Sequence, residues 1–334
     1  MTVVEASAPG KIIIVGEYAV LSDAPAISMA VDQRAQVTIK KHNEKTHILT
    51  TSGYSDTVAR FNISKTGAIE WVDNIAEDSV RLFFESSWSH VCFQSDNFYE
   101  YNLDTTGFYA QAGGYKYGIG SSAALAVAVA AAFVRMFNLT QKVGELASQI
   151  HNTFQNNRGS GVDIETSSIG GVIKYYRDPE KKSVLLDLPE NLKFRIFWCG
   201  TPFNTVTQLK KLGSLNKKSF LALREMAISI ELVLANFSSE FFIDYLKKYT
   251  DTLRRFSDDY DLNIFANKHD ILTDEAKKYP NTIYKPCGAG GDIGICFSLS
   301  SKALDVFECI ASQNGFKLLD LSIDKKGFIS KDWC

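Results

Sequence analysis

A glycine-rich segment that leads directly into an apolar helix is the feature that most constrains the fold of this chain. Four glycines fall between Gly113 and Gly120, and residues from about Ser121 to Phe137 are apolar on nearly every face of a helix. A helix without a polar face has to be buried in a core. The sequence therefore predicts a glycine-rich loop held at the start of a buried helix.

This loop has the chemistry of an anion site. Gly118 and Gly120 carry no side chains, so backbone N–H groups can approach an anion, and the helix start adds unpaired N–H donors and the positive end of its dipole. The hydroxyls of Ser121 and Ser122 can hold a phosphate oxygen or Mg²⁺. The Walker pattern with its lysine is absent. A glycine-rich turn that merely caps a core helix, with Ser121 as N-cap, is the alternative interpretation.

Lysine and acidic residues mark three more stretches. Lys11 precedes a β-branched strand at residues 12–15, and Glu17 and Tyr18 lie on the turn that leaves it. Such a lysine can also simply extend to solvent. The segment Gly159-Ser160-Gly161-Val162-Asp163 presents a carboxylate beside two glycines, and Gly288-Ala289-Gly290-Gly291-Asp292 is a small-residue loop suited to lying against a ligand. The Gly-Ser-Gly-Val-Asp segment also fits many surface turns.

The remaining pattern predicts a mixed α and β protein. Hydrophobic periodicity places strands and helices in alternation, which favours an α+β or α/β class. A charged turn at 177–182 is the predicted boundary between domains 1–180 and 181–334. The expected strands are 12–15, 35–39, 58–63, 97–103, 171–176, 194–198 and 294–298, and the expected helices are 121–137, 140–154, 220–234, 242–256 and 302–313.

Composition narrows the functional classes. The 334 residues have a formal charge of −2, which gives no reason to expect a nucleic-acid partner. The six cysteines show no paired short spacing, so neither a disulfide framework nor a zinc site is predicted. The N-terminus lacks the layout of a signal peptide, and the longest apolar run, 123–134, is well short of the ~20 residues that span a bilayer. We therefore predict a cytoplasmic protein without a membrane partner.

Taken in order, these stretches resemble the motifs of the GHMP kinase superfamily, named for galactokinase, homoserine kinase, mevalonate kinase and phosphomevalonate kinase. Pro9-Gly10-Lys11 with Gly16-Glu17 matches the first motif, residues 118–123 match the phosphate loop, and residues 288–291 match the third motif. The resemblance extends from Ala8 to the C-terminal helix. It implies an α+β fold of two domains, the first like domain 2 of ribosomal protein S5 and the second ferredoxin-like, with the active site between them.

Several details are similar to the phosphomevalonate kinase branch. They are Lys116-Tyr117 before the phosphate loop, the Gly-Ser-Gly form at 159–161, Trp198 to Pro202 with Thr205 downstream, and Asp292. Two features depart from the family pattern. The third motif is one glycine short, and Asn152 stands eleven positions before Asp163, where mevalonate kinases carry a metal-binding glutamate. No carboxylate ligand for Mg²⁺ is therefore assigned.

The resemblance implies that ATP and Mg²⁺ are used to phosphorylate a small anionic acceptor, phosphomevalonate or mevalonate, in isoprenoid precursor synthesis. Lys11 and Asp163 are implied as catalytic residues, and Ser122 as the metal ligand, with Ser121 as second choice. The other implied contacts fall into two sets. Nucleotide binding is assigned to Lys116, Gly118, Gly120, Ser121, Ser122 and Ala123, and acceptor binding to Glu17, Tyr18, Ser160, Gly161, Gly288, Ala289 and Gly290.

Two other functions stay open at this point. One is mevalonate kinase or another sugar or alcohol kinase of the superfamily, and the other is a non-catalytic regulator of the same fold that binds nucleotide or sugar. An alcohol acceptor would require Asp163 to act as or assist a general base. A phosphomonoester, whose second pKa is about 6, is already mostly ionised, so Asp163 would then mainly orient Lys11 and the acceptor. The sequence does not predict an oligomeric state.

Overall fold

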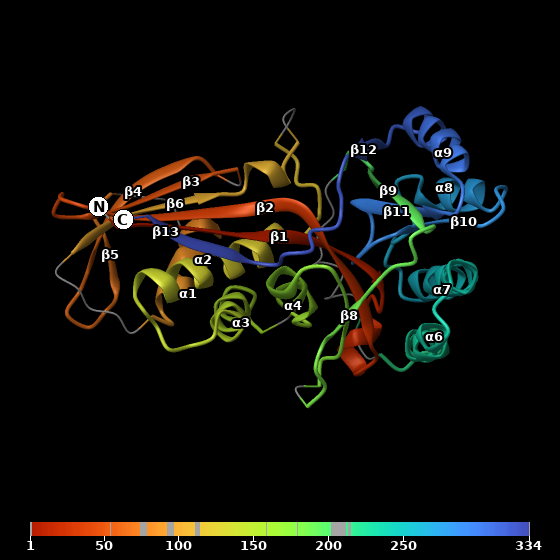
Figure 1. The fold of residues 1–334 in the computed structure, drawn as a ribbon, viewed down its shortest axis with the longest axis horizontal. Coiled ribbons are helices and arrows are strands. Elements are labelled where there is room, and N and C mark those ends of the chain that lie inside the picture. The colour runs from red at the N-terminus through yellow and green to blue at the C-terminus, as the bar shows by residue number, and fades with distance from the viewer. Residues whose placement is uncertain are drawn as a thin grey trace.

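The computed structural model describes residues 2–53, 55–73, 79–91, 97–110, 114–157, 159–178, 180–201, 212 and 215–333. Gly113, Pro202 and Thr205, which the sequence motifs include, lie outside this part of the chain. The molecule is elongated, with the chain termini together at one end and the C-terminal helices α6 to α9 at the other (Figure 1). No helix in the described ranges is long and apolar enough to cross a membrane.

The N-terminal part is built on a nine-stranded sheet. Its strands follow the order β13-β1-β2-β6-β3-β4-β5, with β7 attached to β2 and β8 to β7. Neighbouring strands are antiparallel except β3 and β6, which are parallel. The strands are β1 (Val3–Val15), β2 (Ala26–His42), β3 (His47–Ser52), β4 (Thr57–Ile63), β5 (Ile69–Trp71), β6 (Phe98–Asp104), β7 (Val172–Tyr175), β8 (Val184–Leu186) and β13 (Ile329–Trp333).

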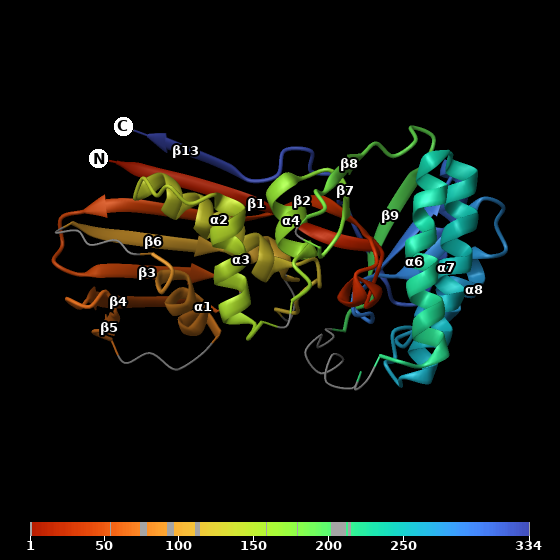
Figure 2. The ribbon, with the colours of Figure 1, turned by 90° about the horizontal axis from the view of Figure 1, so that it is seen from below.

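Four helices cover one face of this sheet (Figure 2). They are α1 (Ser79–Trp88), α2 (Ser121–Met136), α3 (Val143–Phe154) and α4 (Val162–Ile169). Helix α2 packs on β1 and β2 and is covered by α3 and α4, so nearly all of its alanine and valine side chains are buried. The prediction of a helix buried in a core after the glycine-rich loop is confirmed.

The C-terminal part contains a four-stranded antiparallel sheet in the order β10-β11-β9-β12. Its chain order of strand, helices, two strands, helix and strand is that of a ferredoxin-like domain. Helices α6 and α7 pack on one face, and α8 and α9 pack on the other (Figure 1). The elements are β9 (Lys193–Trp198), α6 (Lys218–Ala235), α7 (Ser239–Asp259), α8 (His269–Ala276), β10 (Thr282–Pro286), β11 (Ile293–Ser298), α9 (Ser301–Gln313) and β12 (Lys317–Leu319).

Strand β1 connects the two parts. Burial alternates along its first half, as expected where one face of a sheet meets a core, but Ile12 to Val15 are all buried. Ile12, Ile14 and Val15, and Ala19 of the short 3₁₀ turn η1 (Ala19–Ser22) that follows, belong to the same hydrophobic cluster as side chains of α6 and α7. The two parts are therefore joined by a continuous core.

The last strand returns to the first sheet. Strand β13 pairs with β1, and β8 also belongs to this sheet although both lie beyond residue 181. The predicted division at residues 180 and 181 thus does not coincide with the boundary between the sheets. Arg34 on β2 holds the returning segment: its guanidinium contacts Asp324 and donates to the carbonyl oxygens of Ser7 and Gly327 at 3.0 and 2.6 Å.

We predict that Arg34→Met lowers the free energy of unfolding by about 2–4 kcal/mol, because the nearly buried Asp324 carboxylate loses its cation. Arg135→Met is the matched control. Arg135 pairs with Asp332 on the same returning segment, but both side chains are about half exposed, and its loss should cost less than ~1 kcal/mol. Urea denaturation measures both values. Equal losses in the two variants would show that Arg34 does not anchor the segment.

Candidate active site

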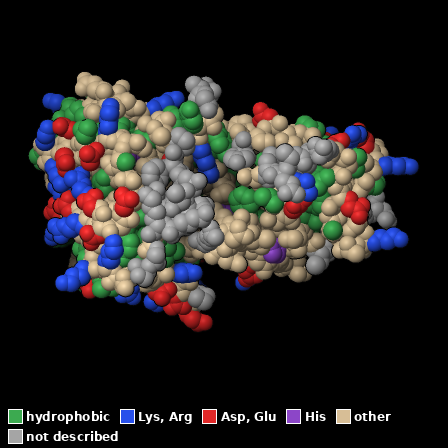
Figure 3. All heavy atoms as spheres, turned by 180° about the vertical axis from the view of Figure 1, so that it is seen from behind, with side chains coloured by type: hydrophobic (Ala, Val, Ile, Leu, Met, Phe, Trp, Pro, Cys, Tyr) green, Lys and Arg blue, Asp and Glu red, His purple; other side chains and the backbone are tan. Residues whose placement is uncertain are grey.

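A cavity of about 860 Å³ lies at the junction of the two parts. Its walls come from β1, the turn after β1, the glycine loop before α2, the start of α4, and the loop between β10 and β11. On the face shown in Figure 3 the surface is hollowed at this junction. The volume falls within the range of ~300–1,000 Å³ that is usual for small-molecule sites.

The glycine loop lies directly on strand β1. The Lys11 backbone N–H donates to the Ile119 carbonyl oxygen at 2.8 Å. Gly10 allows this approach, since a Cβ at that position would lie 2.6 Å from the same oxygen and 2.9 Å from the Phe108 ring. The contact couples the loop to the strand that carries the Lys11 side chain.

Helix α2 presents an open N-terminus to the cavity. Gly120 is its N-cap, with a left-handed backbone (φ 82°), and as a glycine it has no side chain to bond to the first turn. The first turn also carries no acidic residue. Ser121 and Ser122, the first two helical residues, line the cavity. Ala123 does not, and its methyl group is buried in the core, so only its backbone N–H could serve a ligand. These features provide N–H donors and hydroxyls at the positive end of a helix dipole.

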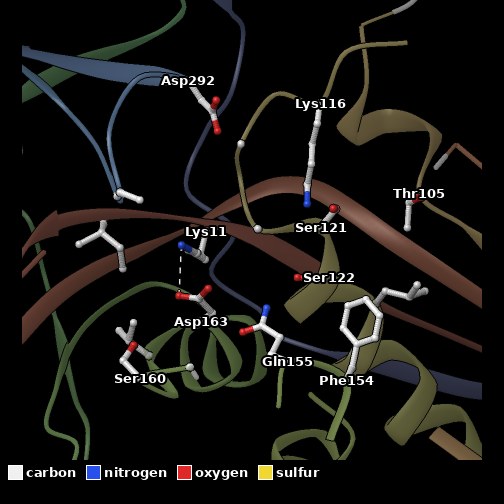
Figure 4. A pocket seen from close by; sticks show the side chains of 18 of the residues that line it. Lys11, Thr105, Lys116, Ser121, Ser122, Phe154, Gln155, Ser160, Asp163 and Asp292 are labelled. Carbon is white, nitrogen blue, oxygen red and sulfur yellow. Dashed lines mark ion pairs between the residues drawn. The ribbon is translucent and has the colours of Figure 1, made fainter. Parts of the chain in front are cut away.

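An ion pair lies at the centre of the cavity. Lys11 Nζ is 3.1 Å from Asp163 Oδ1, and the two side chains keep 12% and 32% of their surface exposed. Asp163 is the second residue of α4, whose N-cap is Gly161 (φ 86°). Figure 4 shows the pair facing into the cavity below the glycine loop. Both residues line one cavity, where the sequence predicts them.

Lys116 and Asp292 lie near the glycine loop (Figure 4). Burial lowers the pKa of Lys116, the Asp292 carboxylate opposes this shift, and the charge of Lys11 adds to it. The Asp292 side chain lies against Gly118, where a Cβ would be 2.4 Å from its Oδ2. A cation and an anion thus border the loop, and Asp292 brings a side chain of the C-terminal part to it.

His151 on α3 is a neighbour of the site that sequence reasoning missed. Its Nε2 lies 3.4 Å from Ser122 Oγ, and the side chain is almost completely buried. Burial lowers the pKa of His151, Asp163 opposes this shift, and Lys11 and Lys116 reinforce it, so the ring is mostly neutral at neutral pH. Ala147 is an apolar residue one turn before His151 on the helix predicted at 140–154, and this spacing could have indicated that His151 faces inward.

The two ends of the cavity differ in character. Ser160 lies on one side of the Lys11–Asp163 pair, and Phe154 and Thr105 lie on the other, beyond the two serines (Figure 4). The Ser160 end is lined by small and aliphatic side chains, namely Ile13, Val20, Leu21, Ala26 and Val162. The Phe154 end combines apolar side chains with hydroxyls, namely Val80, Phe83, Leu103, Leu125, Thr51, Ser52, Ser55 and Thr105.

Most of the residues predicted to bind the acceptor line the cavity. They are Tyr18, Ser160, Gly288, Ala289 and Gly290. Burial raises the pKa of Tyr18, and its protonated hydroxyl donates to the Ala289 carbonyl oxygen at 2.9 Å.

Two predicted acceptor residues are placed differently. Glu17 borders the cavity, but both of its carboxylate oxygens are bonded within the protein, to Lys285 and Tyr249, and its side chain has no exposed surface. Gly161 does not line the cavity. A Cβ there would lie 2.7 Å from the Tyr175 hydroxyl, which donates to the Ser160 carbonyl oxygen. Gly161 therefore makes room for Tyr175 and starts α4.

Comparison with known proteins shows similarity to kinases of one superfamily. Residues 115–171 match the model of the GHMP kinases N terminal domain. Phosphomevalonate kinase from Streptomyces sp. (strain CL190) is 25% identical over 90% of this chain and 91% of its own length. Mevalonate kinase from Pyrococcus furiosus is 28% identical, and this match spans only 55% of each chain. The structure of Streptococcus pneumoniae phosphomevalonate kinase in complex with phosphomevalonate and AMPPNP has a TM-score of 0.77 at 16% identity, over 96% of this chain and 99% of that one.

The chain has the GHMP kinase fold. Both the resemblance to this superfamily and the two-domain α+β class expected from the sequence are confirmed. Within this fold, Asn152 is exposed on α3 and does not line the cavity. The residue of α3 that contacts Ser122 is His151 instead.

The residues present fit a divalent cation only if it is shared with phosphate oxygens. In the described part of the chain, no three His, Cys, Asp or Glu side chains are grouped to hold a metal. Ser122 Oγ at the cavity wall is a hard oxygen ligand of the kind that Mg²⁺ accepts alongside phosphates. Ser122 is therefore the one metal contact predicted for this chain.

Gly118→Ala is predicted to destabilise the protein by about 1–3 kcal/mol more than Gly114→Ala. Both glycines have positive φ angles, 80° and 62°, so backbone strain is similar. A Cβ at Gly118 would meet Asp292, whereas a Cβ at Gly114 would have no atom within 4 Å. Overpacking of this kind costs ~1–3 kcal/mol. Urea denaturation measures the difference, and equal stabilities would contradict the close contact between the glycine loop and Asp292.

Proposed function

We propose that this chain transfers the terminal phosphoryl group of ATP to phosphomevalonate, yielding ADP and diphosphomevalonate. The observation that carries the proposal is the Lys11–Asp163 pair, which lies between an open helix N-terminus and a small, largely aliphatic end of the cavity. The names of the relatives support a kinase of the mevalonate-pathway type.

The glycine loop and the start of α2 suit the phosphates of ATP. Backbone N–H groups from Gly118 to Ala123 would bind them, with Lys116 as an added cation. The Phe154 end suits the base, because a flat apolar ring can pack against the wall formed by Phe83 and Phe154, whose rings meet edge to face at 5.3 Å. Mg²⁺, held by Ser122 together with phosphate oxygens, would neutralise phosphate charge.

Phosphoryl transfer in this site depends on position and charge. An oxygen of the acceptor phosphate would attack the terminal phosphorus of ATP, and the bond from this phosphorus to the bridging oxygen would break as ADP leaves. Lys11 Nζ, beside both groups, would offset the negative charge that gathers between them. Because Asp163 already contacts Lys11 at 3.1 Å, its expected role is to orient Lys11 and the acceptor.

The Ser160 end favours a small acceptor with an aliphatic face. Ile13, Val20, Ala26 and Val162 form one buried cluster against Tyr175, whose hydroxyl bonds to Ser160. A sugar would need several directed polar partners there. Ser160 contributes a hydroxyl beside these aliphatic walls, and this combination suits a branched aliphatic acid such as phosphomevalonate better than a hexose.

Two alternatives remain to be tested against the proposal. The match to mevalonate kinases supports an alcohol acceptor, for which Asp163 would have to act as or assist a general base. A non-catalytic regulator is disfavoured by the presence of both Lys11 and Asp163 in contact.

A screen of ADP release with mevalonate, phosphomevalonate, galactose and homoserine tests the proposal. We expect kcat/KM for phosphomevalonate to exceed that for each other acceptor by ~10²-fold or more. Lys11 would lie beside the acceptor phosphate, which the other three compounds lack, and a site that binds a polar group rejects analogues without it. A higher kcat/KM for mevalonate than for phosphomevalonate would contradict the proposed acceptor. ADP release with none of the four would favour the regulator.

Substitutions of the central pair test the assigned roles. With phosphomevalonate, Lys11→Met should lower kcat more than Asp163→Asn, and the loss in Asp163→Asn should be smaller than the ~10²–10⁴-fold typical of a lost general base. Wild-type activity should rise with pH through about 6, as the acceptor phosphate loses its second proton. Kinetics at saturating ATP between about pH 5.5 and 8.5 measure these effects.

Lys174→Met is the matched control for Lys11→Met. Lys174 on β7 forms an ion pair of similar length, 2.7 Å to Glu231, with 15% of its side chain exposed, and it does not line the cavity. Its kcat should match that of wild type. If Asp163→Asn proves far worse than Lys11→Met on phosphomevalonate, the roles of the two residues are reversed.

A further inference from the structure

A fully buried ion pair joins the two parts of the chain behind the cavity. Glu17 Oε1, on the turn after β1, lies 2.5 Å from Lys285 Nζ on β10, and neither side chain has any exposed surface. Lys285 Nζ also donates to the Pro286 carbonyl oxygen at 2.8 Å. Burial disfavours the charged ammonium, but attraction to Glu17 outweighs it and the pKa of Lys285 is raised. The lysine is therefore charged in the folded protein.

Tyr249 on α7 completes this network. Its hydroxyl donates to Glu17 Oε2 at 2.8 Å and accepts from the Gly16 backbone N–H at 2.8 Å. Burial and the neighbouring Glu17 carboxylate raise the pKa of Tyr249 far above its usual value, so the hydroxyl stays protonated. One hydroxyl of the C-terminal part thus holds both the backbone and the carboxylate of the turn.

The turn adopts a conformation that needs such support. Gly16 has φ 97°, and a Cβ there would lie 2.6 Å from Ala26 Cα. Tyr18, which is not a glycine, has φ 59°. Residues in this region persist only where the surroundings hold them. The network at Glu17 lies between these two positions, and the Tyr18 hydroxyl bond to Ala289 secures the other side.

The same segments form the walls of the acceptor end. Val20 and Leu21 follow the turn and line the cavity, and Cys287, Gly288 and Ala289 follow Lys285 along the chain and line it from the C-terminal part. A shift of the turn would therefore move the acceptor walls. The glycine loop and the start of α2 are held separately, by the bond from Lys11 N to Ile119 O.

We infer that Glu17, Lys285 and Tyr249 are positioning residues for the acceptor, acting through the turn rather than by contact with the substrate. This inference rests on the proposed function. Stability alone does not account for the ion pair, because apolar residues of similar volume often serve as well or better in a core. The directed bonds of the network, from the Gly16 N–H to the Tyr249 hydroxyl and from Lys285 Nζ to the Pro286 carbonyl oxygen, connect both walls of one subsite.

Tyr249→Phe and Tyr245→Phe form a matched pair that tests the inference. Both tyrosines are buried on α7 with rings stacked 6.0 Å apart, but the Tyr245 hydroxyl donates to Met226 and not to the turn. Tyr249→Phe should raise KM for phosphomevalonate by about tenfold and leave KM for ATP within about twofold, since one hydrogen bond to a charged group is lost. Tyr245→Phe should change neither KM, although it also removes a buried hydroxyl.

Thermal melting and amide exchange separate positioning from stability. A merely structural role predicts lower melting temperatures in both variants and equal acceptor KM values, and this result would overturn the inference. Exchange of the Gly16 amide should be faster in Tyr249→Phe, where its acceptor is gone, and unchanged in Tyr245→Phe. Faster exchange with an unaltered acceptor KM also overturns it.

A double variant covers the case in which Tyr249→Phe does not fold. Glu17→Gln with Lys285→Met leaves no unpaired buried charge, and it should fold with a raised acceptor KM and an unchanged KM for ATP. A folded double variant with the wild-type acceptor KM contradicts the inference. The proposed function is tested separately, on the wild-type protein. If another acceptor gives more turnover, the variants are compared with that acceptor. If no acceptor gives turnover, equilibrium binding of phosphomevalonate, measured by calorimetry, replaces KM.

Discussion

The turn between β1 and β2 is embedded in the C-terminal part, and the cavity owes its shape to this contact. Ile12 and Ile14 before the turn, and Tyr18 and Ala19 within it, share one core with side chains of α6 and α7. The Tyr18 ring lies 5.2 Å from that of Phe256. Burial of apolar surface provides the stabilisation, whereas the directed bonds of Glu17 select one orientation of the two parts.

Strand β1 also organises the reactive centre. Because Gly10 lets the Ile119 carbonyl approach the strand, the glycine loop is held beside Lys11. The start of α4 then brings Asp163 to the same lysine. Strand β1 therefore brings together two elements that are far apart in the chain, the glycine loop and the start of α4. Small displacements of β1 would change the distances that phosphoryl transfer depends on.

How much could be predicted from the sequence differs between elements. Helix α2 was predicted because its apolar pattern is long and uninterrupted, and α7 because its apolar stripe repeats at helical spacing. The sequence did not predict helix α8, which is eight residues long, or strand β12, which is three residues long, because segments of this length carry too little hydrophobic periodicity. Strand β13 is mostly exposed and alternates weakly, and it is a strand because β1 offers it an edge.

The candidate site shows the same division. The order of the motifs resembles that of the GHMP kinases, and this resemblance predicted that Lys11, Asp163, the glycine loop and the Gly288–Gly290 loop lie in one place. The partners of Glu17, the inward direction of His151 and the outward direction of Asn152 were decided only by the tertiary structure. A sequence pattern records which groups are present, whereas the pairing of a buried charge depends on side chains more than two hundred residues away.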